Sequence, residues 1–448
     1  MNIIIVGVGN VGQELVGRLS DEGHNIVAVD TDAKKLENII DNYDVKGILG
    51  NGASYEVLEE AGAGFADLLI ACTPHDELNI LCCMVGKKFN AKDTIARIRT
   101  PEYFTLFQGK ELGLSMMVNP EYETAVDIAR ALKFLSAIKI ETFADGKVNL
   151  AEIKINETDA LNGTELKDLA SKFNTKVLIC AVERAGKVHI PKGNFRLEAG
   201  DNVYFTASSK EIAGFFKETT GSKGTRSVMI VGGGMIAFYL AKELRRLGIR
   251  VKIVESNESR CRFLSENLNK VEIIHGDGTG QDLLVDEGLT RTDAFIALCG
   301  FDEQNIILAM FARSKGVKKV IAKVDKMPYY KMLRSVGVES IVSTRAITAD
   351  QIVRYVRGMQ DTVGGKVNKL HRIVNDQAEA LEFSVQSDFK ALGVPLRNVK
   401  LGKQIIIATI IRNNEIIVPD GNSTIEEGDT VIVVTTREFT DDFNEILG

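Results

Sequence analysis

The sequence has few prolines, few cysteines, no surplus of basic residues and no long hydrophobic run. Its 448 residues include 7 prolines and 6 cysteines, and the formal net charge is −6. A hydrophobic content of 45% with 26% charged residues is typical of a soluble globular protein and excludes a disordered or fibrous chain. Since nucleic-acid binding needs clustered basic residues, we expect no nucleic-acid partner.

The longest apolar runs have the length of a strand. The run IIIATII covers residues 405–411, whereas a membrane helix needs about 20 apolar residues. The first apolar residues have no basic region before them and lead straight into a glycine loop, which predicts a strand rather than a signal peptide. We therefore expect a cytoplasmic protein that reaches the inner face of the membrane only through a partner.

The cysteines lie in apolar runs, without a C-x-x-C pair or a histidine at metal-ligand spacing. This pattern predicts reduced core residues, an intracellular protein and no metal site. An alternative for the adjacent pair in NILCCMV is a redox sensor, although the run is typical of a buried helix face. The six residues are Cys72, Cys82, Cys83, Cys180, Cys261 and Cys299.

The second half of the chain repeats the first. Gly7 matches Gly232 and Asp30 matches Glu255, both at an offset of 225, and ADLLIACTPHDELNI matches TDAFIALCGFDEQNI further along. This period is far longer than the ~20–50 residues of solenoid repeats, so a two-domain unit has been duplicated.

Each unit begins with about 135 residues in which six β-branched runs alternate with helical patterns. This order predicts an α/β fold with two doubly wound parallel sheets, hence two Rossmann-like domains. The remaining part of each unit predicts a small α+β module with a hairpin, and the stretches 219–227 and 364–369 resemble linkers. The predicted domains are 1–135 and 226–358 (Rossmann-like) and 136–220 and 366–448 (small modules).

The first unit carries a dinucleotide-type fingerprint between a strand and a helix. In it, Gly7 permits a tight turn, Gly9 lets a pyrophosphate approach the backbone, and Gly12 lets the helix pack on the strand. The phosphate would rest on the helix N-terminus. The fingerprint consists of Gly7, Val8, Gly9, Asn10, Val11 and Gly12, and Asp30 follows at the end of the second strand to bind a ribose diol.

The second unit repeats this pattern, with an alanine at the last position and with Glu255 as the acidic residue. Because an acidic residue there disfavours a 2′-phosphate, NAD(H) or the adenine nucleotides ATP and ADP are expected rather than NADP. The alternative is that both folds merely inherited the loop. The second fingerprint consists of Gly232, Gly233, Gly234, Met235, Ile236 and Ala237.

The two sites differ after the fifth strand. The first unit has Arg97 and Arg99 there, two residues apart and thus on one face of the strand, where the second unit has Lys323 and Asp325. If that face points at the ligand, the first site binds ATP or ADP. The alternative is a solvated strand end.

No catalytic apparatus is evident. His75 follows the fourth strand near the expected nicotinamide position, but the second unit lacks this histidine, and neither glycine loop has the lysine of a P-loop. We therefore predict that the chain is not an enzyme. Arg345, Arg354 and Arg357, on the helix after the sixth strand, form either a solvated face or a surface for a membrane partner.

The domain order and the motifs VGVGNVG, GNGAS, ACTPHDE, ARIRTPEY and EAGDNVYF together resemble the TrkA family of Trk potassium-uptake regulators, built from tandem RCK N- and C-domains. The resemblance implies a regulatory subunit that binds NAD(H) and ATP or ADP and gates a membrane potassium transporter of the TrkH/TrkG type. It also implies a homotetramer with a ring of eight Rossmann-like domains on the cytoplasmic face of the membrane.

The resemblance further implies a set of nucleotide contacts in each unit. The second unit departs from the pattern, since Cys299-Gly300 stands where the first unit has Thr73-Pro74, and the ligand of that site is left open. The implied contacts are Gly7 to Val11, Asp30, Thr73, Pro74 and Arg97 in the first unit, and Gly232 to Ile236, Glu255, Asp277 and Cys299 in the second, to which strand position adds Arg99 and Lys323.

Two other functions stay open from the residues alone. One is an NAD-dependent oxidoreductase with atypical substrate modules. The other is a nucleotide or cyclic-dinucleotide sensor for a different cation channel or exchanger. A sensor would work by population shift, since ligands that prefer one arrangement of the domains favour that arrangement.

Overall fold

A computed structural model describes residues 1–106, 113–133, 137–143, 147–220, 224–326, 333, 338, 340–361, 367–374, 377–436 and 442–448. The chain divides into two compact units, and each unit combines parts of both halves of the sequence. Unit 1 comprises Met1–Ala129 and Val228–Tyr355, and unit 2 comprises Arg130–Ser227 and Val356–Gly448.

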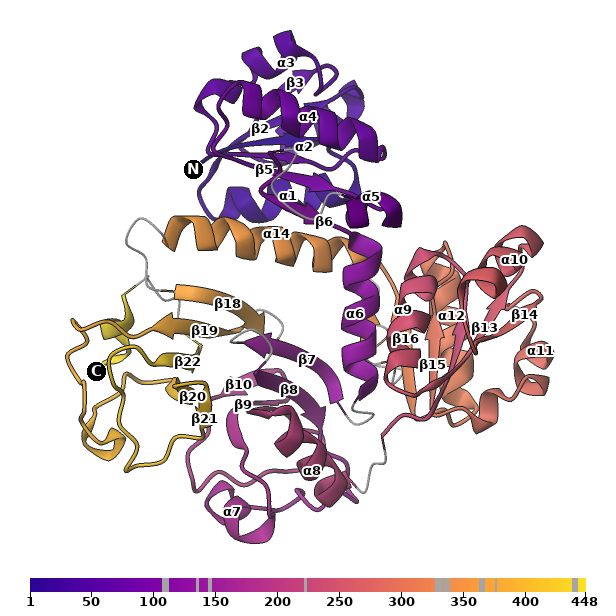
Figure 1. Ribbon diagram of the computed structural model, residues 1–448. Helices are drawn as coiled ribbons and strands as arrows, with labels where there is room; N and C mark the ends of the chain where they lie inside the picture. The colour runs from indigo at the N-terminus through magenta and orange to yellow at the C-terminus, as the bar shows by residue number, and fades with distance from the viewer. Residues whose placement is uncertain are drawn as a thin grey trace. The chain divides into compact units, whose positions relative to one another are not determined.

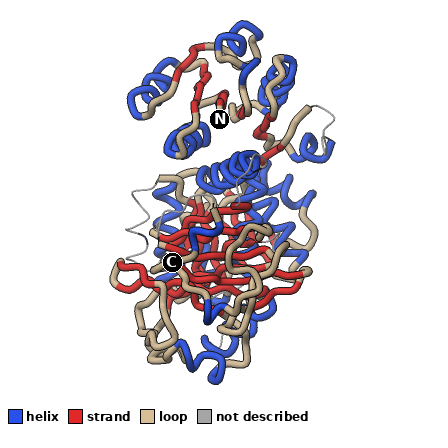
Figure 2. Tube along the Cα trace, turned by 90° about the vertical axis from the view of Figure 1, so that its left-hand side faces the viewer, coloured by secondary structure: helices blue, strands red, loops and turns tan. Residues whose placement is uncertain are grey.

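The first domain of unit 1 is a six-stranded parallel sheet of order β3-β2-β1-β4-β5-β6 (Figure 1). Its strands (red) lie between helices (blue) around the N-terminus in Figure 2. The elements are β1 (Asn2–Val6), α1 (Asn10–Asp21), β2 (Asn25–Asp30), α2 (Ala33–Asn42), β3 (Lys46–Leu49), α3 (Tyr55–Glu60), β4 (Leu68–Ala71), α4 (Asp76–Lys88), β5 (Asp93–Arg97), α5 (Pro101–Leu106), β6 (Met116–Val118) and α6 (Pro120–Lys133).

The second domain of unit 1 repeats this sheet in the order β14-β13-β12-β15-β16-β17. Its central strands β12 and β15 are apolar apart from Ser227, as expected of a parallel sheet with helices on both faces. The elements are β12 (Ser227–Val231), α9 (Met235–Arg246), β13 (Arg250–Glu255), α10 (Glu258–Asn267), β14 (Glu272–His275), α11 (Gln281–Asp286), β15 (Ala294–Ala297), α12 (Asp302–Ser314), β16 (Lys319–Lys323), β17 (Ser340–Val342) and α14 (Thr344–Asp361).

The two Rossmann-like domains are connected through the segments around their last helices. Before α6 begins, the Asn119 side chain donates a hydrogen bond to the Tyr239 hydroxyl of the second domain at 3.2 Å. In return, Asp350 of α14 forms an ion pair with Arg18 of α1, and Tyr355 donates to Asp93 at 3.3 Å. The start of α6 and the middle of α14 therefore lie at the junction of the two domains.

Unit 2 holds the two small modules, each with a five-stranded antiparallel sheet, in the orders β10-β9-β11-β8-β7 and β18-β19-β22-β20-β21. Matched strands occupy matched places in the two sheets. The elements are β7 (Ala137–Phe143), β8 (Val148–Lys154), α7 (Leu169–Lys172), β9 (Leu178–Arg184), β10 (Lys187–His189), β11 (Asn202–Ser208), α8 (Ser209–Thr220), β18 (Val367–Ile373), β19 (Ala378–Ser384), β20 (Ile405–Arg412), β21 (Glu415–Ile417) and β22 (Thr430–Thr435).

The two modules share a buried core. Leu150 and Cys180 of the first sheet lie in one hydrophobic cluster with Ala408 and Val434 of the second, and the Thr206 hydroxyl donates to the Ala408 carbonyl at 2.8 Å. The alternating pattern of VNLAEIKI therefore does not mark an exposed face, because β8 is buried on both sides. The β9–β10 hairpin is confirmed, whereas the first strand of each module, β7 and β18, was not predicted.

The predicted linkers are shorter than expected. Helix α8 extends to Thr220 and β12 starts at Ser227, while residues 221–223 lie outside the described part. In the second linker, Val367 already begins β18.

The cysteines are core residues, as predicted. All except Cys299 are buried, and Cys299 is partly buried. Burial raises the pKa of the Cys82 thiol to about 12 and that of Cys83 further, so neither forms the thiolate that a redox sensor requires.

Candidate functional site

The first glycine loop joins β1 to α1 and has the geometry that the fingerprint requires. Gly7 has φ +91°, and a Cβ there would lie 2.8 Å from the Thr73 backbone nitrogen. A Cβ on Gly12 would lie 2.0 Å from the Gly7 carbonyl oxygen, so only glycine permits this approach of helix and strand. Gly9 has open space at its Cβ position, which leaves its backbone accessible.

The N-terminus of α1 is open to an anion. Gly9 is its N-cap and no side chain caps the helix, so the first backbone N–H groups keep their hydrogen-bonding capacity. Asp30, at the end of β2, accepts hydrogen bonds from the backbone of Val8 at 2.7 Å and Asp32 at 2.9 Å. This carboxylate thus holds the loop in shape and retains lone pairs for a ligand hydroxyl.

The second glycine loop, between β12 and α9, repeats these features. Gly232 has φ +99°, and Gly234 caps α9 with open space at its Cβ position. Glu255 accepts a hydrogen bond from the Gly233 backbone nitrogen at 2.6 Å, as Asp30 does from Val8.

A cavity of about 540 Å³ lies over the first loop, at the carboxyl ends of the parallel strands. Val8 and Gly12 do not line it and instead form part of the loop that supports it. The predicted residues that line it are Gly7, Gly9, Asn10, Val11, Asp30, Thr73, Pro74 and Arg97.

A second cavity of about 430 Å³ lies over the second loop. Every residue predicted for the second site lines it. These residues are Gly232, Gly233, Gly234, Met235, Ile236, Glu255, Asp277, Cys299 and Lys323.

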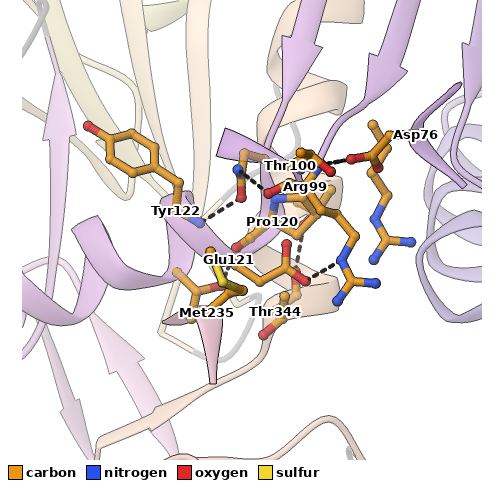
Figure 3. Close-up of polar contacts among 12 residues, drawn as sticks. Asp76, Arg99, Thr100, Pro120, Glu121, Tyr122, Met235 and Thr344 are labelled. Atoms are coloured by element: carbon orange, nitrogen blue, oxygen red, sulfur yellow. Dashed lines mark hydrogen bonds and ion pairs between the residues drawn. The ribbon is translucent and has the colours of Figure 1, made fainter. Parts of the chain in front are cut away.

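The structure separates the two arginines that the sequence placed on one face. Strand β5 ends at Arg97, which lines the first cavity. Arg99 lies beyond the strand, lines the second cavity and donates from its Nε to Glu121 at 2.8 Å (Figure 3). The expectation that both arginines serve the first site was wrong. Strand β5 ends at Arg97, so the alternation of side chains between the two faces of the strand does not extend to Arg99.

Residues of the second domain complete the first cavity, which the sequence analysis missed. Lys323 and Ile236 line both cavities, and Asp325, Thr344 and Arg345 line the first. The interpretation of Arg345 as part of a solvated face was therefore wrong. Its Nε is buried, and one Nη donates to the Asp325 carbonyl.

A buried asparagine links the ends of β4 and β5 in the first domain. Asn79 of α4 accepts from the Thr73 backbone nitrogen at 2.8 Å and the Thr73 hydroxyl at 2.7 Å, and donates to the carbonyls of Thr73 and Arg97 at 3.0 and 2.8 Å. It therefore positions two predicted contact residues. Asn305 makes the corresponding backbone bonds to Cys299 and Lys323. The sequence analysis missed these asparagines, although their presence at the same position in both copies was a signal that could have identified them.

The aspartate that begins α4 holds the segment after β5. Asp76 accepts from the backbone nitrogens of Arg99 and Thr100 at 2.9 and 2.8 Å (Figure 3), and Asp302 does the same for Asp325 and Lys326. Each cavity thus has a fixed wall built by matched side chains.

The position before each of these aspartates differs between the cavities. His75 lines the first cavity, and the matched residue in the second is Phe301. An imidazole can transfer a proton and a phenyl ring cannot, so the two cavities share no acid–base residue at this position.

Comparison with protein families identifies both parts of each unit. The TrkA-N domain matches residues 3–120 and 228–344, and the TrkA-C domain matches residues 150–219 and 380–448. The Trk system potassium uptake protein TrkA homolog of Archaeoglobus fulgidus is 32% identical over 449 residues, covering 100% of both chains. The chain belongs to the TrkA family. TrkA of Vibrio alginolyticus is also 32% identical, over 455 residues, 100% of this chain and 98% of the relative.

Solved structures confirm the fold that the resemblance to TrkA implied. The GsuK channel bound to NAD superimposes with a TM-score of 0.64 at 17% identity, covering 97% of this chain and 76% of that one. The GsuK RCK domain gives 0.63 at 16% identity, with 97% and 92% covered. The chain thus combines Rossmann-like TrkA-N domains with small α+β TrkA-C modules. Within the described ranges, no helix has the length and apolar character needed to span a membrane.

Proposed function

We propose that the chain is the regulatory subunit of a Trk-type potassium transporter, binding NAD(H) and ATP or ADP in its two cavities. The observation that carries the proposal is the pair of matched cavities. Each places a glycine loop, an uncapped helix N-terminus and an acidic residue at the carboxyl edge of a doubly wound sheet. This arrangement suits the pyrophosphate and ribose of a nucleotide.

The relatives support both the ligand and the process. The curated relatives are named as potassium uptake proteins, and GsuK structures are titled as bound to NAD and to ADP. In the proposed mechanism, nucleotides of different charge or redox state prefer different arrangements of the two Rossmann-like domains. The preferred arrangement is passed to a membrane partner of the TrkH/TrkG type at the cytoplasmic face of the membrane.

A regulatory role accounts for the cavities better than an oxidoreductase does. A dehydrogenase places an acid or base beside the nicotinamide, and this group has to be present wherever the reaction occurs. At the position where this group is expected, after the fourth strand of each sheet, the first copy has His75 and the second has Phe301, which has no titratable group. We infer that both cavities bind nucleotides without transforming them.

The proposal is tested by rubidium uptake in cells that lack this chain. The cells are complemented with the natural sequence or with the double variant Gly9→Asp, Gly234→Asp. Both glycines have negative φ and open space at Cβ, so the substitution is compatible with folding and places a carboxylate where a phosphate would lie. Gly358→Asp, at another open position, is the matched control.

We expect uptake to depend on the chain, to be lost in the double variant and to persist in the control. Equal uptake in all cells would refute the assignment to potassium transport. Turnover of NADH by the purified chain with any substrate would instead favour the oxidoreductase.

We further propose that the chain forms a homotetramer, with eight Rossmann-like domains in a ring. Helices α4 and α12 expose apolar side chains at matched positions, Leu81 (48% exposed) with Ile307 (62%) and Met84 (43%) with Met310 (41%). Such a repeated apolar face suits contact with further copies of the chain. Light scattering should give four times the chain mass of 49.1 kDa, with a lower mass for Leu81→Glu, Ile307→Glu. Leu247→Glu, at another exposed leucine, should leave the mass unchanged.

A further inference from the structure

Four polar side-chain atoms that line the first cavity are buried and have no hydrogen-bond partner within the described residues. Two are donors, the Nε atoms of Arg97 and Arg345. The others are the Thr344 hydroxyl oxygen and Glu121 Oε2. A buried donor without an acceptor costs free energy, so such a group is retained where a ligand supplies the acceptor.

The two arginines come from different Rossmann-like domains. Arg97 ends β5 of the first domain, whereas Arg345 is the second residue of α14 in the second domain. Thr344 is the first residue of this 18-residue helix and lies close to Glu121 and Arg99 in Figure 3. Part of the lining of the first cavity is therefore supplied by the other half of the chain.

Asp30, Asp325 and one of the two Glu121 carboxylate oxygens in this cavity are engaged by other groups. Asp30 accepts hydrogen bonds from the backbone of the loop, Asp325 from the Ser343 hydroxyl at 2.9 Å, and Glu121 Oε1 from Arg99. The guanidinium groups of Arg97 and Arg345 have no carboxylate within ion-pair distance among the described residues. The lining of the cavity thus includes two guanidinium groups without a carboxylate partner in the described part of the chain, and arginine binds phosphate through several N–H groups.

We propose that Arg97 and Arg345 together bind the terminal phosphates of an adenine nucleotide that lies on the first glycine loop. This inference rests on the proposed function, because it requires nucleotide binding in the first cavity. It assigns ATP or ADP to that cavity and makes the site composite, with Thr344 as a further hydroxyl donor. The nucleotide then links the two domains through its phosphate chain.

The second cavity has no equivalent of this arrangement. The position that matches Arg345 in the repeat is Glu121, at an offset of 224, and it lines both cavities, the second together with Arg99. A carboxylate stands there in place of a guanidinium, and Arg99 is paired with it at 2.8 Å. The second cavity is therefore less suited to a terminal phosphate, which leaves it for NAD(H).

The test is calorimetry of ATP, ADP and AMP binding to the full chain, in EDTA so that magnesium does not mask the phosphate charge. The background variant Gly234→Asp blocks the second cavity. On this background, Arg345→Gln should weaken ATP and ADP binding by about 10- to 100-fold and AMP binding by less than about 2-fold, as expected for charged hydrogen bonds to phosphate. Arg354→Gln, further along α14, is the matched control and should change neither.

Equal weakening of ATP and AMP by Arg345→Gln, or of neither, would overturn the inference. If Arg345→Gln does not fold, Thr344→Val provides the milder test and should lower ATP affinity several-fold with AMP unchanged. If the background variant binds none of the three nucleotides while the natural chain binds them, the second cavity is their site and the inference is wrong. Absence of binding by the natural chain would reject the proposed function as well.

Discussion

The two nucleotide cavities have the same backbone and different side chains. Both loops have a glycine at positive φ, an uncapped helix and a carboxylate that holds the loop. However, among the described residues Thr73, Arg97 and Arg345 line the first cavity alone, Arg99 and Cys299 line the second alone, and Glu121 and Lys323 line both. Duplication thus preserved the loop geometry that we propose binds a nucleotide, while several of the side chains around it diverged.

The largest effect on stability is expected at the last position of the glycine fingerprint, where the two loops differ. Gly12→Ala should destabilise the first domain by about 3–5 kcal/mol and abolish binding there, because the new methyl overlaps the Gly7 carbonyl. The reverse change at the matched position, Ala237→Gly, should cost only about 1 kcal/mol, from helix propensity. Denaturant midpoints measure both, and similar shifts for the two variants would show that the loops are equivalent.

The next effect concerns the buried asparagines. Asn79→Leu should cost about 2–4 kcal/mol, because it leaves the Thr73 and Arg97 backbone groups without their partners. Asn305→Leu should cost slightly less, since no hydroxyl bonds to Asn305 Oδ1. Thermal unfolding of the two variants and of Asn38→Leu, at an exposed position of α2, checks this order. An unchanged melting temperature for Asn79→Leu would contradict it.

A smaller effect follows from exchanging the residue after the fourth strand. Cys299→Thr should raise the free energy of unfolding by about 0.5–1.5 kcal/mol, because the new hydroxyl can donate to Asn305 as the Thr73 hydroxyl donates to Asn79. Thr73→Cys should lose a similar amount. If the two variants change the free energy of unfolding with opposite signs, the hydroxyl is the group that makes the two cavity walls differ in stability. Changes of the same sign would contradict this.

The smallest expected effect concerns the chemical reactivity of the Cys299 thiol. Burial raises the pKa of the Cys299 thiol to about 11, so only a small fraction is the reactive thiolate at neutral pH. Alkylation of Cys299 should therefore be slow at pH 7, accelerate about tenfold per pH unit up to pH 10, and be blocked by a nucleotide in the second cavity. Cys72 is 4% exposed with a pKa of about 12 and should stay unmodified under the same conditions. Mass spectrometry of labelled peptides distinguishes the two, and modification of both at equal rates would contradict the expectation.

The fold was predictable because it depends on local patterns that occur twice. Strand β4 is apolar at every position and β1 at every position after Asn2, and the glycine spacing fixes the turn between β1 and α1. The exceptions were β7 and β18, whose polar residues obscure the strand pattern, and the burial of both faces of β8, which depends on a second sheet.

The sequence by itself determined the duplication, the parallel sheets, the two glycine loops and the acidic residue that accompanies each. These features follow from residue spacing along one strand, one turn and one helix. Only the tertiary structure decided which charged side chains line which cavity. Arg99 lines the second cavity and Arg345 the first because the segments after β5 and β17 reach the other domain. The proximity of these side chains to the other loop therefore depends on contacts between residues more than 100 positions apart in the chain.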